Sequence, residues 1–274
     1  MTSPPRWNVP PVAELDRAAL AEGVVWDYEI DWLPRRLEIV DRADLLMWRR
    51  TDGPRAERGW ANRVCYVRTT PARADAVIDE ALAFFGTETF TWVVGPTSAP
   101  ADLATRLGRH GLVDGGDGDL LTAELPLRGL RRAAGLEVAE VEDERLARIG
   151  LRLAHPDAAR SELEALLDER MAYLQHPARR GGFLVAFIGG VPVANAGYRY
   201  SADGRTVYLS GAETVDAYRG RGVYQSLVAH RADAAVRRGC RYAAIRARRN
   251  TSLPILLRRG FIDHGHLPIF TRAA

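Results

Sequence analysis

Hydrophobic and polar residues alternate along the chain with two different periods, and the change of period marks the predicted elements. Apolar residues recur at every second position in predicted strands and on one face of predicted helices. In the second half this pattern predicts strands at 136–140, 183–188, 191–200, 206–214 and 242–247, a last strand from Phe261, and helices at 142–153, 158–174, 223–236 and 252–259. Gly189-Gly190 and Asp203-Gly204 are tight-turn pairs that join neighbouring strands.

The first half shows the same alternation in a smaller set of elements. The pattern predicts strands between residues 36 and 50 and at 63–69, 90–94 and 120–125, and helices at 72–85 and 101–110. On the first of these helices four residues are predicted to face inward, namely Ala76, Ile78, Ala81 and Phe84. Residues 1–25 are predicted to form an arm packed on a domain surface, and residues 52–62 a loop.

Length and composition indicate two α/β domains of middling size. A chain of 274 residues exceeds one average domain, and its 47% hydrophobic content can fill two cores. The periodic pattern is interrupted at 126–135, where Pro126 and Gly129 stand among several arginines. We therefore predict domains at 1–128 and 129–274.

The sequence shows neither a membrane span nor a secretory signal. Its apolar runs fall short of the roughly 18 residues that a span needs, and its first residues lack an apolar core. We therefore expect a cytoplasmic protein. Cys65 and Cys240 lie far apart and away from other metal-ligating residues, so we expect two reduced, partly buried thiols and no metal.

The charge of the chain comes from an unusual set of cations. All 38 basic residues are arginine, which a GC-rich genome explains without any function, and the formal net charge is only +3. Arginine suits phosphate contacts through its planar fork of donors. The modest net charge and the absence of a long basic run argue against a nucleic-acid partner.

The most informative stretch is 218–224, which reads Tyr-Arg-Gly-Arg-Gly-Val-Tyr between a predicted strand and a predicted helix. Unpaired N–H groups and the helix dipole favour an anion at the start of a helix. Gly220 and Gly222 would let a phosphate approach closely, and Arg219 and Arg221 add positive charge. The stretch predicts a diphosphate site, although glycine and arginine also occur in ordinary surface turns.

These residues resemble the marker of the GNAT (general control-related N-acetyltransferase) superfamily, which is Arg or Gln, two residues, Gly, one residue, then Gly or Ala. Here the marker begins at Arg219, and Tyr224 replaces its last small residue. A second match runs from Asn250-Thr251-Ser252 to Gly260-Phe261. For residues 136–274 the resemblance implies a mixed, mostly antiparallel sheet that splays open between flanking helices.

The first half also resembles this fold, as a degenerate N-terminal copy of the kind that tandem GNAT proteins carry. The resemblance rests on the predicted strand at 90–94, the helix at 101–110 followed by Gly111, and the strand at 120–125. No glycine-rich marker accompanies it, and generic α/β alternation explains the same pattern. We therefore expect the acyl-CoA N-acyltransferase fold in two copies, of which only the second is catalytic.

The resemblance implies acetyl-CoA as co-substrate and direct transfer of its acyl group to an amine. The diphosphate contacts of the family transfer to the backbone of Arg219, Gly220, Arg221, Gly222 and Val223. The other expected coenzyme contacts are Thr214 and Val215 on the strand edge, Tyr224, and Asn250.

The acceptor is expected to be the primary amine of a small molecule, in a pocket that the first domain helps to shape. Two alternatives stay open. One is a non-enzymatic sensor that binds acyl-CoA, and the other is an acyltransferase that acts on a protein N-terminus or on aminoacyl-tRNA.

Amide formation needs a group that takes the proton of the attacking amine. Glu213, at the end of the predicted central strand, is the first candidate, although a solvent-exposed strand-end glutamate explains it equally well. Tyr208 and Ser210 are the next candidates for catalysis, and strict alternation places them on the opposite face of that strand.

The departing thiolate needs a proton donor or another source of stabilisation. Leucines stand at 256–257, where many family members place a tyrosine, so Tyr224 and Ser252 are the candidate donors. Packing and helix capping explain these two residues as well. His264 and His266 alternate on the last predicted strand and are expected to share one face as surface residues.

Overall fold

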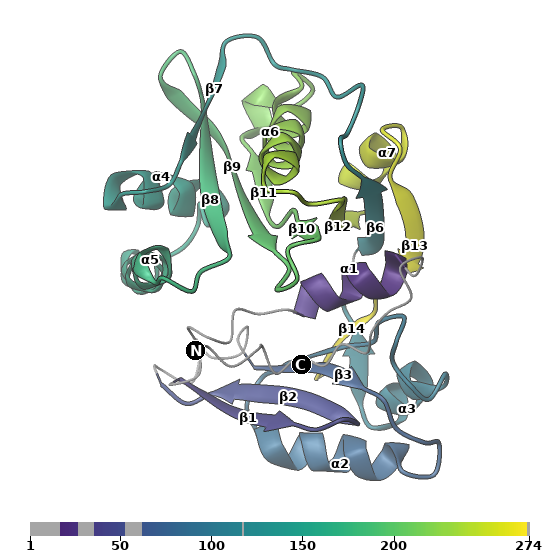
Figure 1. Cartoon of the computed structure of the whole chain (residues 1–274). Helices are drawn as coiled ribbons and strands as arrows, with labels where there is room; N and C mark the ends of the chain where they lie inside the picture. Colours follow the sequence, from purple (N-terminus) through teal and green to yellow (C-terminus); the bar gives the residue numbers. More distant parts are fainter. Residues whose placement is uncertain (1–16, 27–35, 53–61, 117, 273–274) are drawn as a thin grey trace.

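The chain folds into two sheets with a helix between them (Figure 1). The computed structural model describes residues 17–26, 36–52, 62–116 and 118–272. Helix α1 (Arg17–Trp26) lies between the two sheets in Figure 1, and its Ala21 packs in one buried cluster with residues of both. Residues 1–16 of the predicted arm and most of the predicted loop at 52–62 lie outside the described residues, and residues 17–25 of that arm form α1, packed between the sheets and not on a domain surface.

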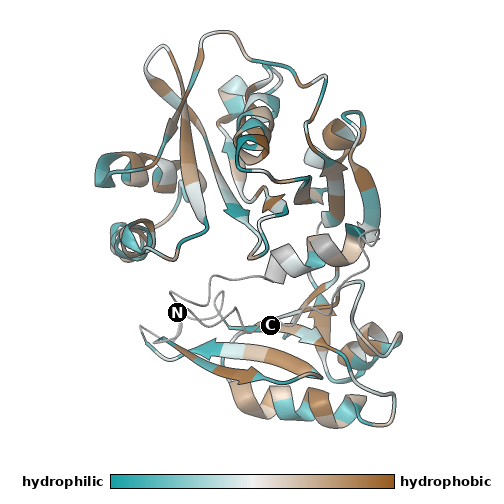
Figure 2. Cartoon of the chain, viewed as in Figure 1, coloured by the Kyte–Doolittle hydropathy of each residue, from teal (hydrophilic) through white to brown (hydrophobic). Residues whose placement is uncertain are grey.

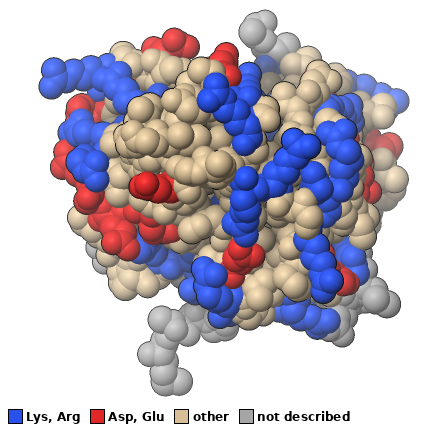
Figure 3. All heavy atoms as spheres, turned by 90° about the horizontal axis from the view of Figure 1, so that it is seen from above, with Lys and Arg blue, Asp and Glu red and all other residues tan. Residues whose placement is uncertain are grey.

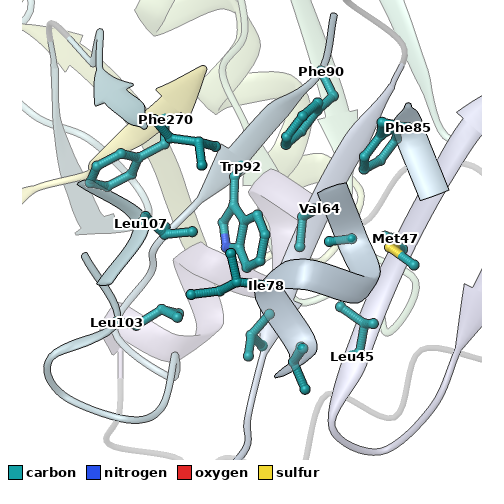
Figure 4. Close-up of a cluster of buried hydrophobic side chains, with 14 residues drawn as sticks. Leu45, Met47, Val64, Ile78, Phe85, Phe90, Trp92, Leu103, Leu107 and Phe270 are labelled. Atoms are coloured by element: carbon teal, nitrogen blue, oxygen red, sulfur yellow. The ribbon is translucent and has the colours of Figure 1, made fainter. Parts of the chain in front are cut away.

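The lower sheet of Figure 1 has six strands in the order β1-β2-β3-β4-β14-β5. Their bounds are Leu37–Asp41 for β1, Leu45–Arg50 for β2, Arg63–Val67 for β3, Thr91–Val93 for β4, Ile269–Arg272 for β14 and Leu112–Asp114 for β5. Helices α2 (Ala74–Phe85) and α3 (Leu103–Arg109) close a core around the fully buried Trp92, against which Ile78, Leu107 and Phe270 pack (Figure 4).

Helix α2 confirms the predicted helix, but its inward face is turned by about one residue. Ile78 and Ala81 are buried as predicted, whereas Val77 and Phe85 take the core positions expected for Ala76 and Phe84. The reason is that residues four apart share a helix face, so the buried stripe that contains Ala81 also contains Val77 and Phe85.

The upper sheet has the order β13-β6-β12-β10-β9-β8-β7, with β11 paired to β9. The bounds are Gly118–Glu124 for β6, Leu136–Glu140 for β7, Gly181–Ile188 for β8, Val191–Tyr200 for β9, Thr206–Tyr208 for β10, Ala212–Thr214 for β11, Tyr242–Arg248 for β12 and Ile262–His266 for β13. Helices α4 (Glu144–Ala154) and α5 (Arg160–Gln175) cover one face, and α6 (Val223–Arg237) and α7 (Ser252–Leu257) the other. The predicted α/β class with a mostly antiparallel, splayed sheet is confirmed.

The two halves of the chain exchange their last strands. Strand β6 belongs to the first half of the sequence, yet it lies between β12 and β13 and pairs with β12 over seven residues, Gly118–Glu124. Strand β14, at the end of the chain, pairs with β4 and β5 in the lower sheet. Residues from Phe261 onward therefore form two strands in different sheets, where the hydrophobic pattern predicted one.

The upper sheet opens in its middle. Strand β10 pairs in parallel with β12 through Tyr208 and Ala244, and the last link is the bond from Leu209 N to Ala244 O at 2.9 Å. Beyond it the predicted strand at 206–214 is interrupted by a bulge at Leu209–Gly211, and β11 pairs only with β9. The edges of β11 and of the second half of β12 therefore diverge and leave an opening between them.

Hydropathy follows this architecture. Figure 2 shows hydrophobic and hydrophilic residues in turn along α2 and on the strands of both sheets, as expected for elements with one buried face. Cys65 and Cys240 are free and buried, in agreement with the prediction of two reduced thiols. None of the helices in the described part of the chain is long and apolar enough to cross a membrane.

Candidate functional site

The glycine turn lies at one end of the opening, immediately before α6. Gly220 has φ 76° and Gly222 has φ 85°, so both adopt the left-handed conformation that side-chain-bearing residues rarely take. Gly222 is the N-cap residue, and its carbonyl accepts the first helical bond from Ser226 N at 2.9 Å. A short 3-10 turn, Asp216–Tyr218, which the sequence pattern does not predict, carries the chain from β11 into this turn.

Space has been left around the first glycine. A Cβ built on Gly220 would meet no atom within 4 Å, so the backbone there borders open space. The following N–H groups stand at the start of a helix of 15 residues and have no carbonyl one turn earlier to bind. The turn therefore presents backbone donors and the positive end of a helix dipole to a free volume.

Arginines surround the turn. Arg219 pairs with Asp216 at 2.8 Å, and the Arg221 guanidinium lies over the Tyr218 ring with 5.1 Å between them. Figure 3 views the molecule from the top of Figure 1 and shows arginine side chains gathered mainly on the right of that view, with most of the acidic side chains on the left. The positive charge of these arginines would attract an anion with several phosphates. Salt would weaken this attraction because the side chains are exposed.

The segment that joins the two halves, residues 125–135, forms a wall beside the turn. Arg131 N donates to Gln225 Oε1 at 3.1 Å, and Ala133 N donates to Ser226 Oγ at 2.8 Å. A Cβ built on Gly222 would lie 3.5 Å from Arg131 Cβ, an ordinary contact distance. The interdomain segment is therefore anchored to the first turn of α6.

The strand edge that leads to the turn pairs with no other described strand on the side of the opening, where Arg219 Nε donates to Thr214 O at 3.3 Å. Val215 N bonds Val193 O at 2.9 Å, and Glu213 pairs with Asn195 in the same ladder. Because bonding alternates along an antiparallel pair, Ala212 and Thr214 direct their backbone groups away from β9. A ligand that enters the opening would meet the backbone of Thr214 on this edge, and Val215 is 38% exposed beside it.

Tyr224 and Ser252 come together across the opening. Burial raises the pKa of Tyr224, while the positive charge of Arg231 and the neighbouring Ser252 hydroxyl oppose this increase. The buried Tyr224 hydroxyl makes no well-formed hydrogen bond, and Ser252 Oγ accepts one from Arg248 N at 2.9 Å. Asn250 is exposed in the turn between β12 and α7. The two candidate proton donors thus meet where α6 and α7 begin.

The bulge moves the other candidate residues onto one face. Tyr208 pairs with Arg199, and Glu213 pairs with Asn195, four residues earlier on the same strand. The Ser210 hydroxyl lies against Gly197, halfway between these two partners. The expectation that Tyr208 and Ser210 lie opposite Glu213 is therefore wrong, because the extra residue at Gly211 resets the alternation.

This face of the sheet lies beneath α4 and beside the lower sheet. Tyr208 packs against the buried cluster around α1 that joins the two sheets. Arg50 on β2 reaches Glu169 on α5 at 3.5 Å, and burial, the largest effect, raises the pKa of Glu169. The Arg50–Glu169 contact therefore links the lower sheet to α5.

His264 and His266 do not share a face. His264 Nε2 lies 2.7 Å from Thr122 Oγ1, whereas His266 pairs with Asp119 across the ladder and contacts Asp114 Oδ2 at 2.6 Å. Thr122 and Asp119 are an odd number of residues apart on β6, so they point to opposite faces. A register shift near Gly265 breaks the alternation on which the prediction rested.

The corresponding opening in the lower sheet is closed by protein. Strand β3 pairs with β4, and past its end the chain returns so that Ala99 N donates to Val67 O at 2.9 Å and Thr69 N donates to Ala99 O at 3.2 Å. Glu22 of α1 is 1% exposed and accepts a bond from Thr97 N at 2.7 Å beside this segment. The first half therefore has neither a glycine turn nor a free strand edge at this place.

Two polar residues of the site were not identified from the sequence. Arg231 on α6 is 1% exposed and bonds the bulge, and Asn195 on β9 has a buried amide nitrogen with no hydrogen-bond partner. Arg231 occupies a position on the apolar stripe four residues after Leu227, and a charge on such a stripe is a detectable signal. Asn195 interrupts an apolar strand in a similar way.

Comparisons with known proteins agree with this geometry. The model of the Acetyltransferase (GNAT) family matches residues 150–261, which contain β8 to β12, the glycine turn and both helices beside it. No protein of curated function matches the sequence.

Solved structures share the fold over both halves of the chain. A GCN5-related N-acetyltransferase from Kribbella flavida is 19% identical with a TM-score of 0.68, over 92% of this chain and 96% of that chain. A tandem GNAT protein from the clavulanic acid biosynthesis pathway is 14% identical with a TM-score of 0.63, over 89% and 86%. A GCN5-related N-acetyltransferase from Sphaerobacter thermophilus is 16% identical with a TM-score of 0.57, over 98% and 94%.

The family match covers the turn, the edge of β11 and the opening, and the structural matches extend the fold to the first half. Residues 150–261 match the GNAT acetyltransferase family, and both halves of the chain share the fold of solved GNAT proteins.

Proposed function

We propose that this protein is an N-acetyltransferase that moves the acetyl group of acetyl-CoA to the primary amine of a small molecule by direct attack. The observation that carries the proposal is the left-handed pair Gly220 and Gly222 at the start of α6, beside the edge of β11 that pairs with no other described strand. Backbone donors for a diphosphate and a strand edge for an extended amide chain are the two surfaces that coenzyme A requires.

The coenzyme would lie along the opening. Its diphosphate would bind the backbone of residues 219–223, and its extended arm would pair with the edge at Thr214 and Val215. Tyr224 and Asn250 border the opposite wall. The exposed arginines of the turn and of the interdomain segment would meet the remaining phosphate charge.

The acceptor amine would approach from the other face, in front of Glu213 and Ser210. Glu213 would take the amine proton, directly or through a water, and the Asn195 amide beside it would help to orient the acceptor. The first half of the chain would form the opposite wall of this pocket, which is consistent with the contact between Arg50 and Glu169. Tyr208 would act from its packed position as part of that wall.

The test is release of free thiol from acetyl-CoA in the presence of a panel of small primary amines. Wild-type protein should release thiol with at least one amine and form the matching amide, seen by mass spectrometry. Gly222→Asp should bind no coenzyme, because a carboxylate would face the diphosphate and the φ of 85° adds strain of about 1–2 kcal/mol. Gly239→Asp, also at positive φ but at the far end of α6, is the matched control and should keep coenzyme binding.

Two results would redirect the proposal. Tight binding of acetyl-CoA without turnover on any amine would favour the acyl-CoA sensor. The leucines at 256–257, where many family members have a tyrosine, support this alternative. Binding of RNA that salt weakens steeply would favour action on aminoacyl-tRNA, and the arginine-rich face of Figure 3 is the surface that would carry it.

A further inference from the structure

Arg231 is a charged residue in the apolar interface between α6 and the sheet. Its exposed fraction is 1%, and Leu227 and Ala235, one turn before and after it, are fully buried. A buried guanidinium needs an explanation, because removal of a charge from water costs several kcal/mol unless strong partners replace the water.

The hydrogen-bond partners of Arg231 are backbone carbonyls. Nε donates to Leu227 O at 3.1 Å, and Nη1 donates to Gly197 O at 2.7 Å and to Ser210 O at 3.0 Å. Gly197 and Ser210 pair at the bulge beyond which β11 diverges from β12. The side chain therefore holds the backbone at the point where the opening begins.

The positive charge of Arg231 is only partly compensated. Its Nη2 atom is buried without a hydrogen-bond partner, and no carboxylate in the described residues forms an ion pair with it. Burial lowers the pKa of Arg231 to about 10, which still leaves the guanidinium protonated at neutral pH. The charge of Arg231 also acts on the Tyr224 hydroxyl, which neighbours Ser252 at the start of α7.

We propose that Arg231 stabilises the negative charge that develops on the sulfur of coenzyme A as the acyl group leaves. The inference rests on the proposed function, because it requires the thioester to lie at the opening. A fixed cation with one unused donor, in a dry site, is the arrangement that stabilises a developing anion without reorganisation.

Atoms and electrons balance in this step. The amine nitrogen attacks the thioester carbon, the new C–N bond forms as the C–S bond breaks, and the bonding electrons leave with sulfur. The amine proton goes to Glu213 or a water that it holds. The sulfur departs as a thiolate beside Arg231 and takes a proton later, from Tyr224 or from solvent.

This role would account for a feature that departs from the family pattern. Leucines occupy residues 256–257, where a tyrosine would protonate the thiolate, and Leu256 is fully buried. With a buried cation at the opening, the sulfur need not be protonated during bond cleavage. The proton donor then becomes dispensable for the chemical step.

The test measures the ionisation of the coenzyme A thiol in the binding site. Calorimetric titrations over a range of pH would compare coenzyme A with S-methyl-coenzyme A, which has no ionisable thiol. An opposite charge nearby should lower the thiol pKa by about 1 to 3 units from its ordinary value of about 8.5. The affinity for coenzyme A, relative to the methylated analogue, should therefore rise up to tenfold per pH unit between the two pKa values.

Two variants separate charge from structure. Arg231→Gln keeps donors for the carbonyls but removes the charge, so the pH-dependent gain in affinity should disappear. Arg231→Lys keeps the charge, so the gain should remain. A purely structural residue would change the melting temperature in both variants and leave the comparison of the two ligands unchanged.

The outcomes are distinct from those of the proposed function. If neither ligand binds the wild-type protein, the proposed function fails. If both bind with the same pH dependence, or if folded Arg231→Gln keeps the gain, the role of Arg231 is refuted and the coenzyme site stands. Should Arg231→Gln not fold, the wild-type comparison and Arg231→Lys decide, and loss of the gain in folded Arg231→Lys counts against the proposal.

Discussion

Truncation of Leu121 tests whether the exchanged strands make the two halves fold as one unit. Leu121 lies on β6, in the first half of the sequence, but its side chain is fully buried in the core of the upper sheet. It pairs with Ile245 across β12 and packs in the same cluster as Ala247. Leu121→Ala therefore removes packing from the upper sheet through a residue that belongs, by sequence, to the lower half.

The expected loss follows from complete burial. Leu→Ala changes in cores cost about 2–5 kcal/mol, against a typical total stability of about 5–15 kcal/mol. With an m value of about 3 kcal/mol per molar urea, a loss of about 3 kcal/mol lowers the urea midpoint by about 1 M. Leu257→Ala, on a leucine that is 41% exposed, is the matched control and should stay within about 0.5 kcal/mol.

The chain offers two probes that see different regions. All six tryptophans lie at or before residue 92, so their fluorescence reports mainly on the first half and on the cluster that joins the sheets, whereas far-ultraviolet circular dichroism reports on the helices of both halves. If the sheets are interlocked, Leu121→Ala should lower both midpoints by the same amount. A tryptophan transition that stays at the wild-type midpoint while the dichroism transition moves would refute the reasoning.

Three further predictions concern the site and its surroundings. Glu213→Gln should lower turnover by about 100-fold with little change in acetyl-CoA affinity, as steady-state and binding measurements would show, and equal activity would remove it as the base. Arg131→Glu should weaken acetyl-CoA binding a few-fold in low salt and less in high salt. The control Arg160→Glu, at the start of α5, should leave acetyl-CoA binding unchanged, and an equal loss of affinity in the two variants would exclude a local contact of Arg131. Burial raises the pKa of the Glu140 carboxyl in the folded state, although the hydrogen bond from Tyr198 and the charge of Arg179 oppose this increase. The protonated carboxyl therefore favours the folded state, and this contribution to stability is lost as the pH rises through the folded pKa. Glu140→Gln should therefore have a higher urea midpoint than wild type at neutral pH, with a difference that shrinks below about pH 4, and a lower midpoint at neutral pH would contradict the sign.

Local patterns predicted most of the elements and the glycine turn, because each depends on neighbours along the chain. Helix α6, the hairpin at Gly189-Gly190 and the positive φ angles of the turn all follow from residue types within a few positions. The strand exchange could not be predicted in this way. Strand β6 would pair equally well with either sheet as far as its own sequence shows, and the choice depends on contacts with β12 and β13 more than a hundred residues away.

Predictions of which face a residue occupies failed where glycine interrupts a strand. Alternation places side chains correctly only while no residue is inserted, and the bulge at Gly211 and the register shift near Gly265 each change the face on which the next residues lie. Arg231 was missed for a related reason. Its partners include the carbonyls of Gly197 and Ser210 at the bulge, and the bulge is not visible in the residues around Arg231.

Among the described residues, the lower sheet is closed at the place where the upper sheet opens, in spite of the shared fold. Closure comes from main-chain bonds between Ala99 and the end of β3, with Glu22 packed behind them, and not merely from missing glycines. Grafting a glycine turn before α2 would therefore not create a second coenzyme pocket. The two sheets therefore differ in their backbone hydrogen bonds at this place. We expect titration with acetyl-CoA to saturate at one equivalent per chain.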